Sequence, residues 1–282
     1  MAGFVALWCR IRYADNPETT DMTRLAFITG ASSGIGQALA WRFHQAGYQL
    51  ALVARRTHEI EAWARARDMD SAGYRIYDAD VSVVDSILSA GRACLAQQGV
   101  PDVVVANAGI SIGMDTTAPE DLEIMARTFA VNNVGMVATF HPFIEAMVKR
   151  GSGALVGIAS VAGIRGLPGH GAYCASKAGV INYCESLRGE LRGTGVKVVT
   201  LSPGYIDTPL TRKNRYPMPF LMQAEDFADK AVKAIESGVS HRVIPWQMGL
   251  VAKLLRALPD RLFDRLLSGQ PRKPRQQHAG KH

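Results

Sequence analysis

The residues that most directly suggest chemistry are Tyr173 and Lys177, which stand four positions apart. On an α-helix this spacing brings both side chains to one face. A lysine charge about 4 Å from a phenol contributes roughly 4 kcal/mol at an effective dielectric constant near 20. Since one pKa unit corresponds to about 1.4 kcal/mol, this charge is expected to lower the tyrosine pKa from about 10 by up to about three units. Tyr173 is therefore a candidate proton donor and acceptor, although a helical spacing of this kind is frequent by itself.

A glycine-rich turn at residues 29–36 suggests a second chemistry, the binding of phosphate. Gly30, Gly34 and Gly36 have the spacing G-x-x-x-G-x-G and follow a short apolar run. Glycines let the backbone turn tightly and let a pyrophosphate approach closely, and a following helix offers free N–H groups at its N-terminus. A flexible loop is the alternative, but the position between a predicted strand and a predicted helix favours a dinucleotide-binding turn.

The elements that must position these residues alternate between strands and helices. Short apolar runs predict strands at 25–29, 48–54, 74–80, 103–106, 154–160 and 197–201, with 242–245 as a candidate seventh. Helical spacing of apolar residues predicts helices at 37–46, 58–68, 84–97, 119–149, 172–192 and 227–237. Apolar strands that alternate with helices form a parallel sheet covered on both faces. The prediction is an α/β fold with a doubly wound parallel sheet of about seven strands.

The composition and charge describe a folded domain with a basic tail. Of the 282 residues, 48% are hydrophobic and 20% are charged, which excludes a disordered chain. Residues 241–282 hold nine basic and two acidic residues, which accounts for the whole formal charge of +7. A neutral body with a basic tail is not a nucleic-acid-binding domain. We expect residues 1–22 to be a flexible extension or a misassigned start, 23–245 the doubly wound domain, and 246–282 a helical appendix with a basic tail.

The cysteines, histidines and apolar runs indicate whether disulfides, a metal site or a membrane segment are expected. The four cysteines include no C-x-x-C pair and the histidines are scattered, so neither disulfides nor a metal site are expected. The apolar run at residues 4–8 is too short for a signal peptide, and no stretch approaches the roughly 18 apolar residues of a spanning helix. A cytoplasmic protein is therefore expected.

Several motifs occur together in an order that closely resembles the short-chain dehydrogenase/reductase family. They are the turn at 29–36, Asp80-Val81, Asn107-Ala108-Gly109, Asn132, Ser160, Tyr173-x-x-x-Lys177, and Pro203-Gly204 with Thr208. The resemblance implies a Rossmann-like fold and hydride transfer between a nicotinamide cofactor and a carbonyl or secondary alcohol.

The resemblance also implies catalytic roles. Tyr173 is expected to give a proton to the carbonyl oxygen or to remove it in the reverse direction. Lys177 is expected to lower the tyrosine pKa and to hold the nicotinamide ribose, and Ser160 to hydrogen-bond the substrate oxygen. Asn132 is expected to anchor the water chain that resupplies the proton, although the adjacent Asn133 leaves this assignment open.

The end of the second predicted strand bears on the choice of cofactor. An NAD site needs a carboxylate there for the ribose 2′-hydroxyl, but Arg55 and Arg56 follow the strand and the next acid is Glu59. Two guanidinium groups suit a 2′-phosphate, which makes NADP(H) the predicted cofactor. A solvated arginine pair is the alternative.

The resemblance assigns the remaining cofactor contacts. Asp80 is expected to bond the adenine amino group, to act as a helix cap before Ser82, or to do both, and the segment 203–208 is expected to hold the carboxamide. The complete predicted cofactor set is Gly30, Ser32, Ser33, Gly34, Ile35, Gly36, Arg55, Arg56, Asp80, Val81, Asn107, Ala108, Gly109, Tyr173, Lys177, Pro203, Gly204, Ile206 and Thr208.

The substrate is less sharply indicated. The segment after Thr208 is predicted to form a lid rich in apolar residues, which suggests a hydrophobic ketosteroid, retinoid, ketoacyl compound or xenobiotic ketone. Arg212, Lys213 and Arg215 in this lid would either meet an acidic group or form a solvated basic loop. A cofactor-binding regulatory or scaffold protein without turnover is the alternative function.

Two surfaces suggest partners. The predicted helices at 119–149 and 172–192 are expected to pair in a homodimer or tetramer, as the resemblance implies. The appendix carries an apolar stripe at helical spacing that includes Leu250, Leu254, Leu262 and Leu266, beside basic residues. Such a helix either lies peripherally on a membrane or packs on the body of the protein.

Overall fold

The computed structural model describes residues 24–212, 214, 217–269, 273 and 275. The predicted extension at residues 1–22 lies outside this range. In the described chain, seven parallel strands form one sheet in the order β3-β2-β1-β4-β5-β6-β7. The strands are β1 (Leu25–Thr29), β2 (Gln49–Ala54), β3 (Tyr74–Asp78), β4 (Val103–Ala106), β5 (Gly153–Ile158), β6 (Val196–Pro203) and β7 (His241–Ile244). The predicted parallel sheet, including its seventh strand, is confirmed.

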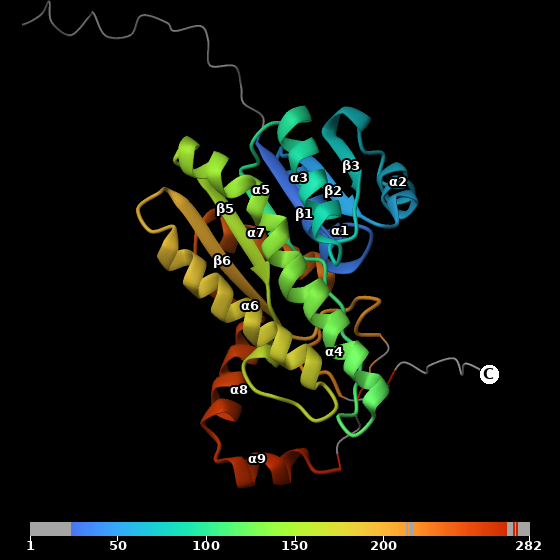
Figure 1. The fold of residues 1–282 in the computed structure, drawn as a ribbon, viewed down its shortest axis with the longest axis vertical. Helices are drawn as coiled ribbons and strands as arrows, with labels where there is room; N and C mark the ends of the chain where they lie inside the picture. The colour runs from blue at the N-terminus through green and yellow to red at the C-terminus, as the bar shows by residue number, and fades with distance from the viewer. Residues whose placement is uncertain (1–23, 213, 215–216, 270–272, 274, 276–282) are drawn as a thin grey trace, which may run out of the picture.

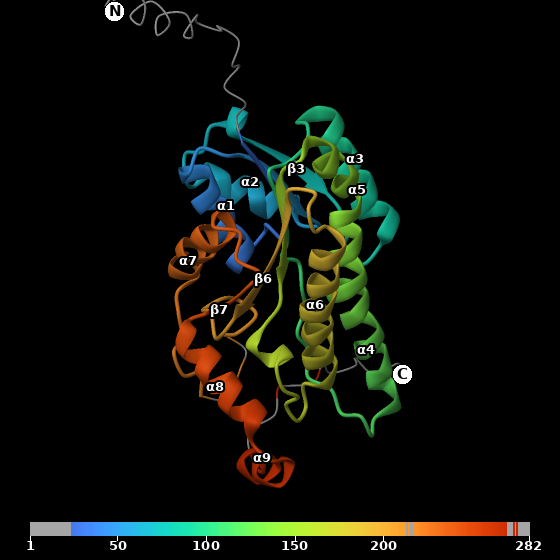
Figure 2. The same ribbon diagram turned by 90° about the vertical axis from the view of Figure 1, so that its left-hand side faces the viewer.

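Helices cover both faces of this sheet, as Figure 2 shows with α1 and α7 on one side and α5 and α6 on the other. The principal helices are α1 (Gly34–Gln45), α2 (Thr57–Arg65), α3 (Val84–Gln97), α4 (Leu122–Phe129), α5 (Gly135–Arg150), α6 (Gly171–Glu190), α7 (Ala224–Glu236), α8 (Trp246–Ala257) and α9 (Asp260–Leu267). Successive residues of a strand point to opposite faces, so Ile28 joins the core under α1 and α7, whereas Phe27 joins the core under α3 and α5. The doubly wound Rossmann-like architecture is therefore observed.

The strand order reverses beside β1. The chain moves from β1 outward to β2 and β3, then returns to β4 on the other side of β1. Because the connections diverge at this point, a crevice opens at the carboxyl ends of β1 and β4, where open α/β sheets bind their ligands.

The prediction of one continuous helix at 119–149 is wrong, because this stretch is divided into four helical segments. The stretch consists of a 3-10 turn (Pro119–Asp121), α4, a π-helical turn (Ala130–Val134) and α5. A π turn inserts an extra residue into the helix. The two asparagines of the turn use their side-chain amides to bind Ser176, which lies on α6: Asn132 reaches its hydroxyl and Asn133 its carbonyl oxygen, each at 2.9 Å.

Two strands end two residues earlier than predicted. β3 ends at Asp78 and β5 at Ile158, so Asp80 and Ser160 lie in the loops beyond the strands. Each of these side chains accepts a hydrogen bond from the backbone N–H two residues later, at 2.9 Å for Asp80 and 3.2 Å for Ser160. Such a bond replaces the strand ladder with a turn.

The C-terminal helices extend from the last strand. Figure 1 shows α8 and α9 beyond the carboxyl ends of the strands. Met248 and Ala252 of α8 are buried, whereas Leu250 and Leu254 are exposed. Within the residues described, no helix combines the length and apolar character needed to cross a membrane.

Candidate active site

The glycine-rich turn joins β1 to α1 in a conformation that requires glycine. Gly30 and Gly34 have φ angles of +68° and +56°, in the left-handed region. A Cβ at Gly36 would collide with the carbonyl oxygen of Gly30. The Ser33 side chain, at the N-cap, makes no capping hydrogen bond in the described structure. The first-turn N–H groups of α1 are therefore available to an anion.

A clamp between β1 and β4 supports this turn. Thr29 Oγ1 accepts hydrogen bonds from the backbone N–H groups of Asn107, at 3.1 Å, and Ala108, at 3.2 Å. In return, Asn107 Nδ2 donates to the carbonyl oxygen of Thr29 at 2.9 Å. Sequence reasoning missed this use of Thr29, because the two residues stand 78 positions apart.

Basic residues lie at the carboxyl end of β2. Arg55 donates to Asp80 Oδ2 at 3.3 Å, and Arg56 donates to Ser32 Oγ at 3.3 Å. Arg56 also pairs with Glu59 at 3.2 Å. Both guanidinium groups are largely exposed, so each can exchange its present partner for an anion in solution.

Asp80 serves two neighbours at once. Its Oδ1 accepts from the backbone N–H and the hydroxyl of Ser82, at 2.9 and 2.7 Å, while Oδ2 faces Arg55. Partial burial raises the pKa of Asp80, but the hydrogen bonds from Ser82 and the Arg55 charge outweigh burial and lower it. Asp80 thus closes the turn before Ser82, whereas the N-cap of α3 is Val83, so the helix cap foreseen as an alternative is not observed.

Tyr173 and Lys177 lie on α6, as the four-residue spacing predicts. Lys177 Nζ donates to the backbone carbonyl of Ile158 at 2.7 Å and lies 5.9 Å from the centre of the Tyr173 ring. Ser160 follows β5, is buried, and its side chain interacts with that of Tyr173. The structure therefore brings Ser160, Tyr173 and Lys177 together around the carboxyl end of β5.

The expected lowering of the tyrosine pKa is not observed. Burial raises the pKa of Tyr173, and a hydrogen bond with Ser160 opposes this effect. Lys177 lies too far from the ring to reverse it, and burial lowers the pKa of the lysine itself to about 8. In this arrangement the phenol is protonated at neutral pH and is ready to donate.

Asn132 lies behind the reacting residues. Its Oδ1 accepts from the backbone N–H of Ile110 at 2.8 Å, and its Nδ2 donates to the Ile110 carbonyl at 3.0 Å. The side chains of Asn132 and Lys177 both border Gly109, where a Cβ would lie 3.3 and 3.4 Å from them. Asn133 instead binds the backbone of α6.

The segment after β6 closes the other side of the site. Thr208 lies against Gly34, where a Cβ would be 3.1 Å from the threonine methyl group. Ile206, before the predicted lid, and Met222, at its end, form a parallel bridge, so the two ends of the lid lie side by side. Arg212 pairs with Asp207 at 2.8 Å. Lys213, Arg215 and Tyr216 of the lid lie outside the described residues.

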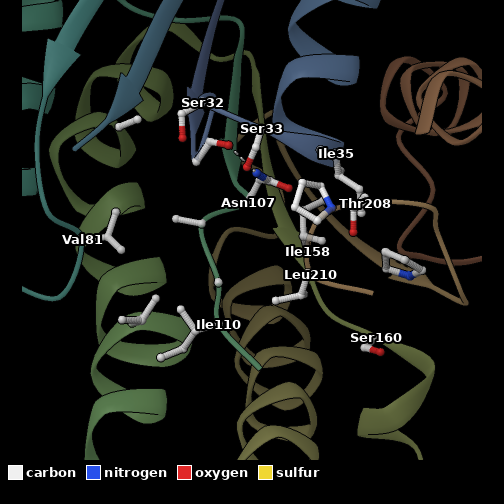
Figure 3. Close-up of a pocket in the computed structure, with 18 of the residues that line it drawn as sticks. Ser32, Ser33, Ile35, Val81, Asn107, Ile110, Ile158, Ser160, Thr208 and Leu210 are labelled. Carbon is white, nitrogen blue, oxygen red and sulfur yellow. Dashed lines mark hydrogen bonds between the residues drawn. The ribbon is translucent and has the colours of Figure 1, made fainter. Parts of the chain in front are cut away.

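These elements enclose a cleft of about 270 Å³. Figure 3 shows Ser32, Ser33 and Asn107 near the strand ends and Ser160 at the far end of the cleft. All predicted site residues line it except Gly36 and Asn132, which lie behind its wall. Lining residues outside the predicted catalytic and cofactor sets are Val53, Ala54, Ala79, Ser82, Ile110, Arg127, Val131, Ile158, Ala159, Pro209, Thr211 and Leu210, the last of which belongs to the predicted lid. Most are neighbours of predicted residues, whereas Arg127 reaches the cleft from α4 without a motif.

A second cavity of about 150 Å³ adjoins the cleft. Ser160 and Tyr173 line both spaces. The walls of the second cavity are mostly apolar and include Ile164, Leu167 and Leu255. Among the described residues, no group of three or more histidine, cysteine or acidic side chains is arranged to hold a metal ion.

Comparison with known proteins identifies relatives. A family model described as short chain dehydrogenase matches residues 24–218. A protein named uncharacterized oxidoreductase from Myxococcus xanthus is 38% identical over 241 residues, which cover 86% of this chain and 95% of that protein. A serine dehydrogenase complexed with NADP+ aligns with a TM-score of 0.71 at 24% identity, covering 78% of this chain and 94% of its own. A 3-ketoacyl-(acyl-carrier-protein) reductase from Brucella melitensis complexed with NADH aligns with a TM-score of 0.70 at 26% identity. The alignment covers 78% of this chain and 96% of the reductase chain.

Proposed function

Because this chain belongs to the short-chain dehydrogenase family, we propose that it is an NADP(H)-dependent oxidoreductase that interconverts a carbonyl and a secondary alcohol. The observation that carries the proposal is the position of Ser160 and Tyr173 at the junction of the cleft and the apolar cavity. A substrate oxygen held at this junction would be within reach of both hydroxyl groups.

The cleft fits a dinucleotide through its backbone. Gly30 and Gly34 adopt positive φ angles, and the lack of a side chain at Gly36 keeps the turn compact. The uncapped start of α1 would hold the pyrophosphate. Arg55 and Arg56 would bind the 2′-phosphate of NADP(H), since no carboxylate stands at these two positions.

The bound nicotinamide would supply or accept the hydride. Tyr173 would donate its phenolic proton to the carbonyl oxygen during reduction, and Ser160 would hydrogen-bond the same oxygen. Burial raises the pKa of Tyr173, which keeps the phenol in the protonated form that carbonyl reduction uses. The Lys177 ammonium would hold the ribose of the nicotinamide half of the cofactor. Asn132, which borders Gly109 together with Lys177, would position the path that returns the proton.

The second cavity indicates a largely apolar substrate, because most of the surface that lines it is apolar. Met248 and Leu255 line the cavity, so the appendix at 246–282 contributes to the site of the catalytic domain at 23–245.

The outer faces of α5 and α6 would form the interface of a homodimer or tetramer. Val134, at the end of the π-helical turn, and Val148 of α5 are 49% and 36% exposed, and Ile181 of α6 is partly buried. A second copy of the chain is the occupant that covers these apolar side chains, because short-chain dehydrogenases oligomerise.

The outer faces of α8 and α9 would lie on an anionic membrane surface of a cytoplasmic enzyme. The inner face of α8 packs on the body, as the alternative in the sequence analysis foresaw, through the buried Met248 and Ala252. The outer faces expose large apolar side chains beside basic residues, a composition that suits an interfacial helix. The apolar members are Trp246, Leu250, Leu254, Leu262 and Leu266, and the exposed basic members are Lys253, Arg256, Arg261 and Arg265.

The proposed function is tested by following NADPH and NADH consumption with short-chain ketones, oxo acids, ketosteroids and retinal. Wild type should prefer NADPH, and each of Arg55→Ala and Arg56→Ala should lower kcat/KM for NADPH about tenfold, the effect of one exposed charged contact with phosphate. Glu59→Gln should raise NADPH use, because it frees Arg56 from its ion pair. Arg92→Ala, on the exposed face of α3, is the control.

Equal use of the two cofactors by wild type would contradict the NADP(H) assignment. Cofactor binding with no carbonyl turnover across the whole panel would instead favour a regulatory or scaffold protein.

A further inference from the structure

A surface groove of about 360 Å³ lies beside the last strand of the described sheet, between α7, β7 and the start of α8. Figure 2 shows these three elements following one another along one side of the molecule. In the described sheet β7 pairs only with β6, so its outer edge offers backbone N–H groups to a ligand. The groove shares no lining residue with the cleft or the apolar cavity, and is therefore a separate site.

The groove is cationic. Lys230 and Lys233 reach it from α7, where their spacing places them on one face, and Arg242 reaches it from β7. All three residues are exposed, and none of them makes an ion pair or a side-chain hydrogen bond with another described residue. The described residues that line the groove include no acid.

The acidic side chains of α7 do not neutralise this groove. Asp229 pairs with Arg42 at 2.8 Å, and Glu236 pairs with Arg24 at 3.5 Å. Asp226, in the first turn of the helix, does not line the groove. The positive charge is therefore left for an anion from solution.

An exposed apolar stripe continues from the groove along α8. Trp246, which lines the groove, is 66% exposed, and Leu250 and Leu254 are 59% and 67% exposed. Their spacing of four residues places the three side chains on one face of the helix. A free phosphate or an acidic peptide would use the charges but not this stripe. An anionic phospholipid uses both, because its phosphate meets the cations and its acyl chains meet the apolar side chains.

We propose that the groove binds the phosphate of an anionic phospholipid headgroup, while the stripe on α8 lies at the acyl-chain boundary. The inference rests on the proposed function, because it takes the contact of α8 with a membrane as its starting point. Arg242 can bind phosphate oxygens bidentately, the two lysines act as point charges, and the Trp246 indole offers one N–H donor. Tryptophan is also enriched at membrane interfaces. The headgroup site adds α7 and β7 to the membrane-facing surface and thereby fixes the orientation of the enzyme.

The test measures binding of two soluble short-chain lipids, dihexanoylphosphatidylglycerol and dihexanoylphosphatidylcholine, by isothermal titration calorimetry. The full chain is first saturated with NADP+, so that the basic residues of the cofactor cleft are occupied. The anionic phosphatidylglycerol should bind at one site, at least about tenfold more tightly than the zwitterionic phosphatidylcholine. Lys230→Gln/Lys233→Gln should weaken its binding about thirtyfold, the contribution of two basic residues at an anionic surface, and Lys230→Arg/Lys233→Arg should retain it.

The matched control removes the same charge elsewhere. Arg65→Gln/Arg92→Gln alters exposed residues of α2 and α3, far from β7 in the strand order, and should bind the lipid like wild type. Inorganic phosphate and a polyglutamate peptide, titrated in the same way, should bind more weakly than phosphatidylglycerol, because neither engages the stripe.

Five results would overturn the proposal. They are equal affinity of wild type for both lipids, no binding of either lipid, an equal loss in the control and the groove variant, inorganic phosphate or polyglutamate binding as tightly as phosphatidylglycerol, and a groove variant that binds lipid like wild type. If that last variant also loses oligomeric mass in light scattering, the groove is an interface with a second copy of the chain.

Failure of the proposed function is distinguishable. Binding of the soluble lipid, without sedimentation of the full chain on phosphatidylglycerol vesicles, would refute the membrane contact alone. Sedimentation without binding of the soluble lipid would refute the headgroup site and leave the contact of α8. NADPH consumption should be the same in wild type and Lys230→Gln/Lys233→Gln, because the groove and the cleft share no residue.

Discussion

Replacing Lys177 with methionine is expected to remove a pH dependence from the stability of the protein. Burial lowers the pKa of Lys177 from 10.5 to about 8. The unfolded chain keeps the usual value, so between these two values the unfolded state binds more protons than the folded state, and the free energy of unfolding of wild type rises with pH. At about 1.4 kcal/mol per pKa unit, the rise due to Lys177 totals about 3 kcal/mol.

At neutral pH two effects of the substitution oppose each other. Lys177→Met removes the full cost of burying the ammonium group, which is about 3 kcal/mol. It also leaves the carbonyl oxygen of Ile158 without its 2.7 Å hydrogen bond. An unsatisfied buried acceptor costs about 1–3 kcal/mol, so the net change at pH 7 lies between zero and a gain of about 2 kcal/mol. The slope with pH is therefore the sharper readout.

The assay is urea unfolding of wild type and Lys177→Met at several values between about pH 7 and pH 10. Relative to the variant, wild type should become more stable as pH rises above about 8, by up to about 3 kcal/mol. Lys253→Met, at an exposed position on α8, should show no such trend. A difference between wild type and Lys177→Met that stays constant across this range would refute the reasoning about the buried amine.

Three further outcomes are expected. Tyr173→Phe should reduce kcat by at least about a hundredfold, because only the proton carrier is lost, while NADPH affinity measured by fluorescence stays within about twofold; substantial activity would contradict the mechanism. Light scattering at micromolar concentration should show at least a dimer, and Val134→Glu should yield monomers; a monomeric wild type would exclude the interface on α5 and α6. Full-length protein should sediment with anionic liposomes at low salt, whereas the double variant Leu250→Ser/Leu254→Ser should not. The control Leu122→Ser, which alters an exposed leucine of α4, should sediment like wild type. Equal sedimentation of all three proteins would exclude membrane contact through α8.

Residues that act through local spacing were predictable. The turn with Gly30, Gly34 and Gly36 lies between a strand and a helix because its spacing encodes the backbone conformations that the junction needs. Tyr173 and Lys177 share the cleft because helical geometry sets their relation. The apolar runs likewise predicted every strand of the described sheet.

Contacts between distant segments were not predictable. The clamp of Thr29 with Asn107 joins the ends of two strands that become neighbours only when the sheet forms. The π turn at Asn132 depends on Ile110 and on α6, so helical periodicity alone described it as ordinary helix. The partial pairing of Arg55 with Asp80 likewise follows from the adjacency of β2 and β3.

The sequence by itself determined the alternating α/β architecture and the glycine-rich turn, and it predicted Tyr173 and Lys177 on one face of a helix, because periodicity and motif spacing are properties of neighbouring residues. Tertiary structure decided what surrounds those groups. Burial raises the pKa of Tyr173 and lowers that of Lys177, and burial depends on every element packed around α6. The fold also places Lys273 in the wall of the apolar cavity, through a tail anchored to residues more than 150 positions earlier. No local pattern encodes such a contact, because it exists only after the chain has closed on itself.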